Sequence, residues 1–412
     1  MAKKSKETIS YKQLTKSQKE GADYFDEWFR NKKFQQKPIL RIGGPAGTGK
    51  SFFIRYLKEK YKLTKMNCLF VSYTGQAVNI LRRNGIPAKT IHSTFMEARE
   101  VPLKKDGKII KRGGIPLMTI RFIPVTHISS MVKLIIVDEA SFLPETLEEL
   151  ISSFNVPVLE MGDPIQLPPV AGKQCFNLDT LDVFFNDPMR HAKESEILEL
   201  ATRIRLGMQV DPSRYFREVT FMRNRGSMEE TFQEFQPFFQ YSDCTICATN
   251  RQRTIITDLY RRNILKTESP YPVKGERLIC RRNNWNLLLG DYPLTNGTIG
   301  KALYTVGRSS IDRKTHLYYM DFKPEYIDND YYSNLVCDTD FLTAPFGDKG
   351  YDKYNIGNKF EYAHAITVHL SQGSQFNSVL YVDQYIRDLE YLLRLRYTAV
   401  TRAQKNLYYI LP

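Results

Sequence analysis

The sequence predicts an α/β protein with two main domains, each built around a parallel β-sheet. A chain of 412 residues is too long for one ordinary hydrophobic core, so two or more domains are expected. Apolar segments that end in polar turns alternate with helical segments in both halves of the chain, and this alternation is typical of parallel sheets. Two β-rich stretches interrupt it and predict small insertions. The expected boundaries are residues 1–95 and 132–186 for the first domain, 96–131 for an inserted β-hairpin, 187–275 and 357–412 for the second domain, and 276–356 for an inserted small β-barrel.

The composition is that of a soluble globular protein with a strong positive charge. Lys and Arg number 59 against 45 Asp and Glu, which gives a formal net charge of +14. Because the basic residues are spread along the chain, a polyanion is the expected partner, and nucleic acid leads. A basic protein without such a partner is the alternative. Aromatic residues make up 12% of the chain and supply surfaces on which bases can stack.

Nothing in the sequence predicts a membrane or secreted protein. No apolar run approaches the roughly 20 residues of a membrane span. The N-terminal residues 1–6 are basic and no apolar segment follows them, so no secretory signal is expected. Cys244 and Cys247 form a C-x-x-C, but no second pair or nearby His completes a zinc site. We expect buried thiols in a cytoplasmic protein.

A complete G-x-x-x-x-G-K-S phosphate loop occupies residues 44–51. The apolar run 38–42 precedes it as a strand and residues 52–57 follow as a helix, which is the context that the motif needs. Glycines let backbone N–H groups point at phosphate oxygens, and the helix N-terminus adds partial positive charge. Lys50 is expected to reach the β- and γ-phosphates of ATP, and Ser51 to ligate Mg²⁺. A glycine-rich turn that binds nothing is the alternative. The predicted nucleotide-binding residues of the loop are Gly44, Pro45, Ala46, Gly47, Thr48, Gly49, Lys50 and Ser51.

Two further segments complete the predicted hydrolytic site. The apolar strand 133–137 runs directly into Asp138 and Glu139, which are expected to hold Mg²⁺ and to deprotonate the attacking water, respectively. A strand that simply ends in two acids is the alternative. Residues 156–169 form another strand and a stiff polar loop, and this places Gln166 beside the γ-phosphate.

A helix is expected upstream of the phosphate loop. Thr15 is its expected N-cap, and Tyr24, Phe25 and Trp28 keep helical spacing. The amide of Gln18 can reach an adenine edge, and a surface glutamine is the alternative.

Polar turns follow other strands at residues 72–77 and 90–93, and the strand predicted at 245–250 ends in polar groups. In an open parallel sheet ligands bind at the carboxyl ends of strands, so these turns are candidate binding surface. For His92, the alternative is a packed loop residue.

Together these segments resemble a superfamily 1 helicase, and the 1B branch of the RecD and phage Dda type matches best. The resemblance covers nearly the whole chain. Its most specific parts are Gly-Asp-Pro-x-Gln-Leu-Pro-Pro at 162–169 and Tyr-Thr-Ala-Val-Thr-Arg-Ala at 397–403. It implies two RecA-like domains of the P-loop NTPase class that bind ATP and Mg²⁺, a wedge in residues 96–131, and a small Src-homology-type barrel in 276–356.

The resemblance also implies roles for residues that local patterns do not explain. Arg190 and Arg402 look like the arginines that contact the γ-phosphate, Gln18 looks like the adenine contact, and Gly373 falls in a nucleotide-binding segment. The positions that match strand contacts of the family are Thr74, Thr90, His92, Asn250, Thr367, His369 and Ser371. Leu370 departs from the family, which often has Lys there, and Gln375 stands where many relatives have Glu or Thr.

The expected function is an ATP-driven DNA helicase that moves along single-stranded DNA and parts a forked duplex. The 5′→3′ direction, a monomeric motor, single-strand-binding or replication proteins as partners, and a bacterial or phage-infected cell are implied by the resemblance alone. An RNA-tracking or nucleoprotein-remodelling ATPase of the same superfamily is the first alternative. A nucleic-acid-binding scaffold with a vestigial ATPase is the second, and the intact set of catalytic side chains argues against it.

Overall fold

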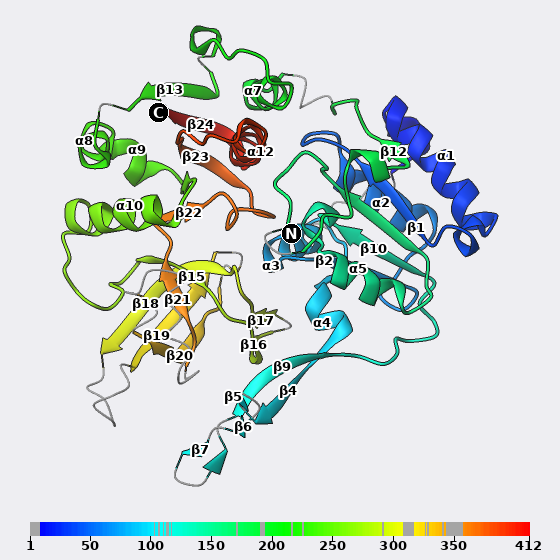
Figure 1. The fold of residues 1–412 in the computed structure, drawn as a ribbon, viewed down its shortest axis with the longest axis horizontal. Helices are drawn as coiled ribbons and strands as arrows, with labels where there is room; N and C mark the ends of the chain where they lie inside the picture. Colours follow the sequence, from blue (N-terminus) through cyan, green and yellow to red (C-terminus); the bar gives the residue numbers. More distant parts are fainter. Residues whose placement is uncertain are drawn as a thin grey trace. The chain divides into compact units, whose positions relative to one another are not determined.

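The protein is described from a computed structural model. The described residues are 9–102, 104–105, 108–109, 111–112, 115–116, 118–169, 172–189, 194–215, 217–224, 226–290, 292–307, 317–325, 327, 329–339, 342 and 357–412. The chain forms two compact units (Figure 1). Unit 1 comprises residues 1–73, 77–164 and 168–189, and unit 2 comprises residues 74–76, 165–167 and 190–412.

Unit 1 is built on a six-stranded sheet with the order β12-β1-β11-β10-β2-β3. All of its strand pairs are parallel, as the alternation of strands and helices predicts. The strands are β1 (Ile39–Gly43), β2 (Cys68–Ser72), β3 (Ala88–Thr90), β10 (Leu134–Asp138), β11 (Val158–Gly162) and β12 (Val183–Phe184).

Helices cover both faces of this sheet, because its central strands are apolar on both sides. Along β10, Leu134 and Ile136 pack into one buried cluster, and Ile135 and Val137 pack into another. The first cluster includes residues of α1, α2 and α3, and the second includes residues of α4 and α5. The helices are α1 (Lys16–Arg30), α2 (Lys50–Lys60), α3 (Gly75–Arg83), α4 (Ile91–Phe95) and α5 (Glu145–Ser152).

The segment between β3 and β10 forms the β-hairpin extension that the sequence predicts. Its long arms, β4 (Met96–Pro102) and β9 (Met118–Pro124), pair antiparallel (Figure 1). Shorter strand pairs follow beyond them: β5 (Lys104–Lys105) with β6 (Lys108–Ile109), and β7 (Lys111–Arg112) with β8 (Ile115–Pro116). The Asp-Gly turn expected at 106–107 lies outside the described residues, although the pairing of Lys105 with Lys108 flanks it.

Unit 2 contains a second, five-stranded parallel sheet with the order β13-β24-β23-β14-β22. Its strands are β13 (Val219–Arg223), β14 (Cys244–Cys247), β22 (Ala365–Thr367), β23 (Phe376–Val382) and β24 (Ala403–Leu411). One buried cluster includes residues of α7 and α12, and another includes residues of α8, α9 and α10. The helices are α7 (Glu196–Arg205), α8 (Met228–Glu234), α9 (Gln236–Tyr241), α10 (Asn250–Asn263) and α12 (Leu389–Val400).

The second insertion forms an antiparallel sheet with its own core, which we call the β-module. Its strand order is β20-β19-β18-β15-β21. The sheet extends past residue 356, because β21 pairs with β15 before the chain re-enters the parallel sheet as β22. The strands are β15 (Arg277–Cys280), β18 (Ile299–Gly307), β19 (Leu317–Pro324), β20 (Tyr332–Asp338) and β21 (Phe360–Tyr362), with a separate hairpin of β16 (Asn284–Leu289) and β17 (Tyr292–Leu294).

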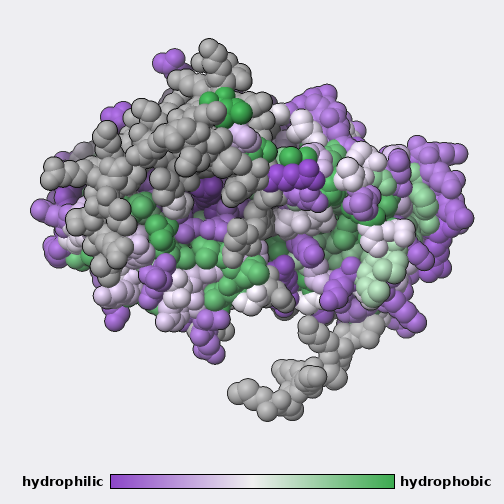
Figure 2. Space-filling model, turned by 90° about the horizontal axis from the view of Figure 1, so that it is seen from below, coloured by the Kyte–Doolittle hydropathy of each residue, from purple (hydrophilic) through white to green (hydrophobic). Residues whose placement is uncertain are grey.

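Two sequence expectations about side chains are confirmed, namely the N-cap of α1 and the buried thiols. Thr15 caps α1 in a capping box with Gln18. Cys244 and Cys247 are buried free thiols, and no cluster of metal-ligating side chains occurs among the described residues. In the described part of the chain, no helix has the length and apolar character needed to cross a membrane. Hydrophilic residues dominate the described surface in Figure 2, with smaller hydrophobic patches.

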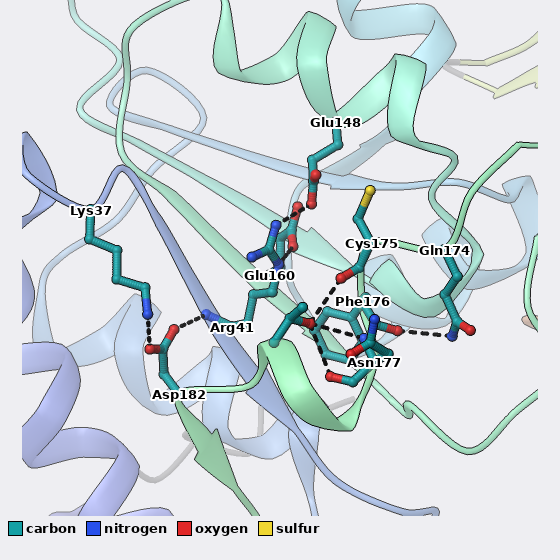
Figure 3. A network of polar contacts seen from close by, with 10 residues as sticks. Lys37, Arg41, Glu148, Glu160, Gln174, Cys175, Phe176, Asn177 and Asp182 are labelled. Atoms are coloured by element: carbon teal, nitrogen blue, oxygen red, sulfur yellow. Dashed lines mark hydrogen bonds and ion pairs between the residues drawn. The ribbon is translucent and has the colours of Figure 1, made fainter.

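A buried ionic cluster links β1, β11 and α5 of unit 1 (Figure 3). Arg41 on β1 donates to Glu160 on β11 at 2.9 Å and to Glu148 on α5 at 2.6 Å. The Glu160 side chain is 1% exposed. Burial and the charge of Glu148 raise the pKa of Glu160 to about 8, although Arg41 lowers it in part. Two carboxylates thus share one guanidinium, and the buried one favours its protonated form.

Replacing Arg41 by methionine is expected to lower the free energy of unfolding by about 3 kcal/mol, because Glu160 and Glu148 both lose the guanidinium that donates hydrogen bonds to them. Chemical denaturation of purified protein measures this. Lys33 and Glu27 form an ion pair in which both side chains are 55% exposed. Lys33→Met is the control and is expected to cost less than about 1 kcal/mol. Equal effects of the two substitutions would contradict a special role for the buried cluster.

The raised pKa of Glu160 predicts a pH dependence of stability. Since folding favours the protonated form, its stabilising contribution is complete below the ordinary pKa of 4.5 and is lost as the pH rises through about 8. Glu160→Gln replaces the neutral acid by a neutral amide. It is expected to flatten this part of the profile of stability against pH. Denaturation midpoints of wild type and Glu160→Gln, measured between pH 5 and pH 9, test this prediction. The prediction would be refuted if the midpoints of both proteins changed with pH in parallel.

Candidate nucleotide and strand-binding sites

The phosphate loop connects the end of β1 to the start of α2. Gly47 and Gly49 have φ angles of +82° and +77°, which residues with a Cβ rarely adopt. The Lys50 ammonium donates to the carbonyl oxygens of Gly44 and Pro45 at 2.7 and 3.2 Å, so it lies within the curve of the loop. The loop therefore has the backbone of a phosphate cradle, with its lysine on the inner side.

Two segments far away in the sequence hold this loop. Gln18 of α1 is fully buried, and its amide nitrogen donates to the Thr48 carbonyl at 2.9 Å. Its amide oxygen accepts from the Thr15 N–H at 3.0 Å. The backbone N–H of Met189 donates to the Gly47 carbonyl at 2.9 Å. A Cβ on Gly49 would lie 2.6 Å from the Gln18 amide nitrogen, so this glycine is also required by close packing. The role of Met189 was not predicted.

The two predicted acidic residues lie at the end of β10, which is separated from β1 by β11. Asp138 ends β10 and is 6% exposed, and the next residue, Glu139, has a left-handed backbone with φ of +58°. Burial and the charge of Glu139 raise the pKa of Asp138 to about 7, whereas Lys50 lowers it. The Glu139 Oε2 atom is buried without a hydrogen-bond partner. Ser72, which was not predicted, donates to the Asp138 carbonyl at 3.0 Å and fixes the strand end.

This arrangement fits a nucleotide and a hard divalent cation. Asp138 and the hydroxyl of Ser51, the second residue of α2, supply oxygen ligands of the kind that Mg²⁺ prefers. A cation would offset the cost of the buried carboxylate charge, and the unpartnered oxygen of Glu139 is free to accept a proton. Phosphate oxygens would meet the N–H groups of the loop at the N-terminus of α2.

Predicted strand contacts of unit 1 lie at the same edge of the sheet. The last residues of β10, β2 and β3 are in register, so Asp138, Ser72 and Thr90 form a row. Thr90 caps α4 and accepts from the Ser93 N–H at 3.2 Å. The ring of His92 lies 5.9 Å from that of Tyr73 and 6.0 Å from that of Phe122, and burial lowers its pKa. Thr74, which belongs to unit 2, is half-buried and directly precedes α3.

Strand contacts predicted for unit 2 also gather at one sheet edge. Cys247 and Thr367 are in register at the ends of β14 and β22, and exposed Asn250 begins α10 just beyond β14. His369 stacks on Tyr391 at a centroid distance of 6.3 Å, and burial lowers its pKa. Ser371 is different, because it is fully buried and donates to the Val368 carbonyl at 2.7 Å.

The remaining predicted catalytic residues belong to unit 2. Gln166 is 3% exposed, and its backbone carbonyl accepts from Arg394 of α12 at 3.4 Å. Arg402 is 4% exposed, and its guanidinium donates to the carbonyls of Thr398 and Ser374 and to the Thr401 hydroxyl at 3.0 to 3.2 Å. Gly373, nearby in sequence, has φ of +74°. Arg190 lies outside the described residues.

Comparison with known proteins agrees with this architecture. A family model described as an AAA domain matches residues 32–231, and one described as a UvrD-like helicase C-terminal domain matches residues 362–410. A structure of two coordinating Pif1 helicases at forked double-stranded DNA matches with a TM-score of 0.53 and 16% identity. A Bacteroides Pif1 helicase with ADP-AlF3 and single-stranded DNA matches with a TM-score of 0.50 and 16% identity. Each match covers 97% of this chain and 94% of the other.

The fold and the phosphate loop define a P-loop NTPase with two RecA-like sheets. Within that class, residues 362–410 match a UvrD-like helicase C-terminal domain, and the full-length fold is similar to that of Pif1 helicases. Both findings agree with the resemblance to the superfamily 1B branch. It is an ATP-hydrolysing helicase.

Proposed function

We propose that this helicase translocates 5′→3′ along single-stranded DNA and couples ATP hydrolysis to the unwinding of a forked duplex. The observation that carries the proposal is the row of residues at the carboxyl edge of the unit 1 sheet. The Lys50 loop follows β1, Asp138 ends β10 and Thr90 ends β3 of the same parallel sheet, so that hydrolytic and strand-contact residues share one edge. The Pif1 helicases of similar fold, studied with single-stranded and forked DNA, support the choice of DNA. The direction rests on the 1B resemblance.

The residues supply the chemistry as follows. Lys50 contacts the β- and γ-phosphate oxygens, and Glu139 takes a proton from the attacking water. By the resemblance, Arg190 and Arg402 are the arginines that offset the charge developing on the γ-phosphate. Ser51 and Asp138 would hold Mg²⁺, which would supply polarisation of the phosphates. Strand contacts to phosphate and sugar make the motor indifferent to sequence. We further propose a monomeric cytoplasmic motor in a bacterial or phage-infected cell.

ATP turnover without nucleic acid, with single-stranded DNA and with RNA of equal length tests the proposal. Strong stimulation by DNA alone is expected. Forked duplexes with only a 5′ tail or only a 3′ tail then give the direction, and unwinding of the 5′-tailed fork is expected. Equal stimulation by RNA would favour an RNA-tracking motor. No stimulation by either would refute the strand-contact assignments.

A further inference from the structure

A buried ionic cluster joins α10 to the β-module. Arg253 of α10 donates from Nη1 to the Glu361 carboxylate on β21. The Nε of Arg281, which follows β15, lies 3.4 Å from the same carboxylate oxygen. The side chains of Arg253, Glu361 and Arg281 are 8%, 7% and 10% exposed. The Glu361 carboxylate therefore forms ion pairs with two buried guanidinium groups, one from α10 and one from the segment after β15.

The cluster lies on both segments that carry predicted strand contacts. Arg253 is one helical turn after Asn250 on α10. Glu361 lies on β21, and the chain continues from there into β22 and Thr367. Arg281 follows β15, which pairs with β21, so Arg281 and Glu361 both belong to the β-module and the Arg253–Glu361 contact joins α10 to it. Glu361 is thus the common contact of the α10 start, the Thr367 turn and the β-module.

A second buried cluster joins the same parts at the other end of α10. Arg261 donates to Glu276 at 2.8 Å, and His364 Nε2 lies 3.0 Å from the same carboxylate oxygen. The rings of Tyr260 and His364 stack with centroids 4.0 Å apart. Because α10 is held to the β21–β22 segment at both ends, these elements have the contacts of a single rigid body.

Glu361 is the member whose loss has the clearest electrostatic result. Burial and the charge of Arg253 lower the pKa of Arg281, and Glu361 raises it, so the two guanidinium groups repel each other across the shared carboxylate. Removal of that carboxylate charge in a poorly solvated site leaves the repulsion uncompensated and pushes α10 and the β-module apart.

We propose that Glu361 is a positioning residue that fixes the strand-contact residues Asn250 and Thr367 to each other and to the β-module. Movement of the gripped strand then moves the β-module with it, and this couples translocation to unwinding. The inference rests on the proposed strand-tracking function. It adds a residue that touches neither nucleotide nor strand, and it assigns the link between α10 and the β-module to the Arg253–Glu361 pair.

Glu361→Gln tests the proposal, with ATP turnover measured over a range of single-stranded DNA concentrations. The concentration for half-maximal stimulation is expected to rise about tenfold while DNA-free turnover is unchanged, and the base pairs unwound per ATP are expected to fall. Glu325→Gln is the control. Glu325 accepts two hydrogen bonds from Arg277, at 2.8 and 2.9 Å, beside Asp243 at the opposite end of β14 from Asn250. This control is expected to change neither quantity.

Two more variants change the two arginines of the cluster. Arg281→Gln keeps the pair of Arg253 and Glu361, so it is expected to change the half-maximal DNA concentration and the unwinding per ATP less than Glu361→Gln does. Arg253→Lys keeps the charge, so it is expected to weaken DNA stimulation less than Glu361→Gln. The Arg281→Gln and Arg253→Lys variants also test the proposal if thermal melts show that Glu361→Gln is unfolded.

Normal DNA dependence and normal unwinding per ATP in folded Glu361→Gln would overturn the inference. So would equal defects in Glu325→Gln, because the effect would then be one of general stability. If wild-type turnover is not stimulated by single-stranded DNA at all, the proposed function fails instead. The two failures are therefore distinguishable.

Discussion

Lys50→Ala is expected to lower ATP turnover by at least about 10²-fold, the cost of removing one preorganised donor from a developing charge. The ammonium lies on the inner side of the loop, 2.7 Å from the Gly44 carbonyl, and it lowers the pKa of Asp138 through its charge. Its removal takes the only lysine of residues 44–51 from the place where phosphates would bind. Single-stranded DNA binding is expected to persist, because no predicted strand contact touches Lys50. Steady-state turnover and fluorescence anisotropy with labelled DNA measure the two properties.

Lys58→Ala is the matched control for this substitution. Lys58 lies on the same helix and carries the same charge, but it is two turns away from the loop. Its loss is expected to leave turnover within about twofold of wild type, since an isolated surface charge contributes little. Normal turnover in Lys50→Ala would remove the phosphate loop from the mechanism. Equal losses in both variants would point to the overall charge of α2.

The elements that could be predicted are those whose signals are local. The loop at 44–51 required a strand before it and a helix after it, and β1 and α2 are present there. Thr15 caps α1 because an N-cap needs only backbone N–H groups three residues away. Likewise, an apolar run that ends in two acids predicts a strand with Asp138 at its end, and Asp138 is the last residue of β10 in a parallel sheet.

Contacts between distant residues left no such signal. Gln18 was expected to face adenine, yet its amide nitrogen donates to the Thr48 carbonyl and holds the loop. Nothing near Met189 indicates that its N–H closes the same loop. Glu160 lies in a strand whose other side chains are mostly apolar, and its partners Arg41 and Glu148 come from two other elements. Its ion pair therefore has no local signal in the sequence.

The direction of a side chain is also decided by tertiary packing. The motif predicts that Arg402 contacts a phosphate and that Ser371 contacts a strand, but a motif gives only a position. In the structure both side chains donate to oxygens of their own unit. The end of the second insertion was equally hard to predict, because β21 is a short strand whose partner β15 lies across the whole insertion.

Glu139→Gln is expected to lower hydrolysis by about 10² to 10⁴-fold, the usual contribution of a general base, while ATP still binds. Glutamine has the size of glutamate and keeps the loop contacts, but it cannot take a proton from water. The structure gives two reasons to single out this residue. Its Oε2 atom is buried without a partner. Its left-handed backbone costs on the order of 1 kcal/mol and is held by β10 on one side and the turn η3 (Ala140–Phe142) on the other.

Single-turnover hydrolysis and equilibrium nucleotide binding separate the two parts of this prediction. Glu149→Gln on α5 is the control, because it removes the same charge from an exposed position. A variant that binds ATP but stops before hydrolysis is expected to remain on single-stranded DNA in the ATP-bound state. Wild-type turnover in Glu139→Gln would show that another group takes the proton. Loss of ATP binding together with turnover would instead mean that Glu139 shapes the loop, and that its strained backbone serves binding rather than proton transfer.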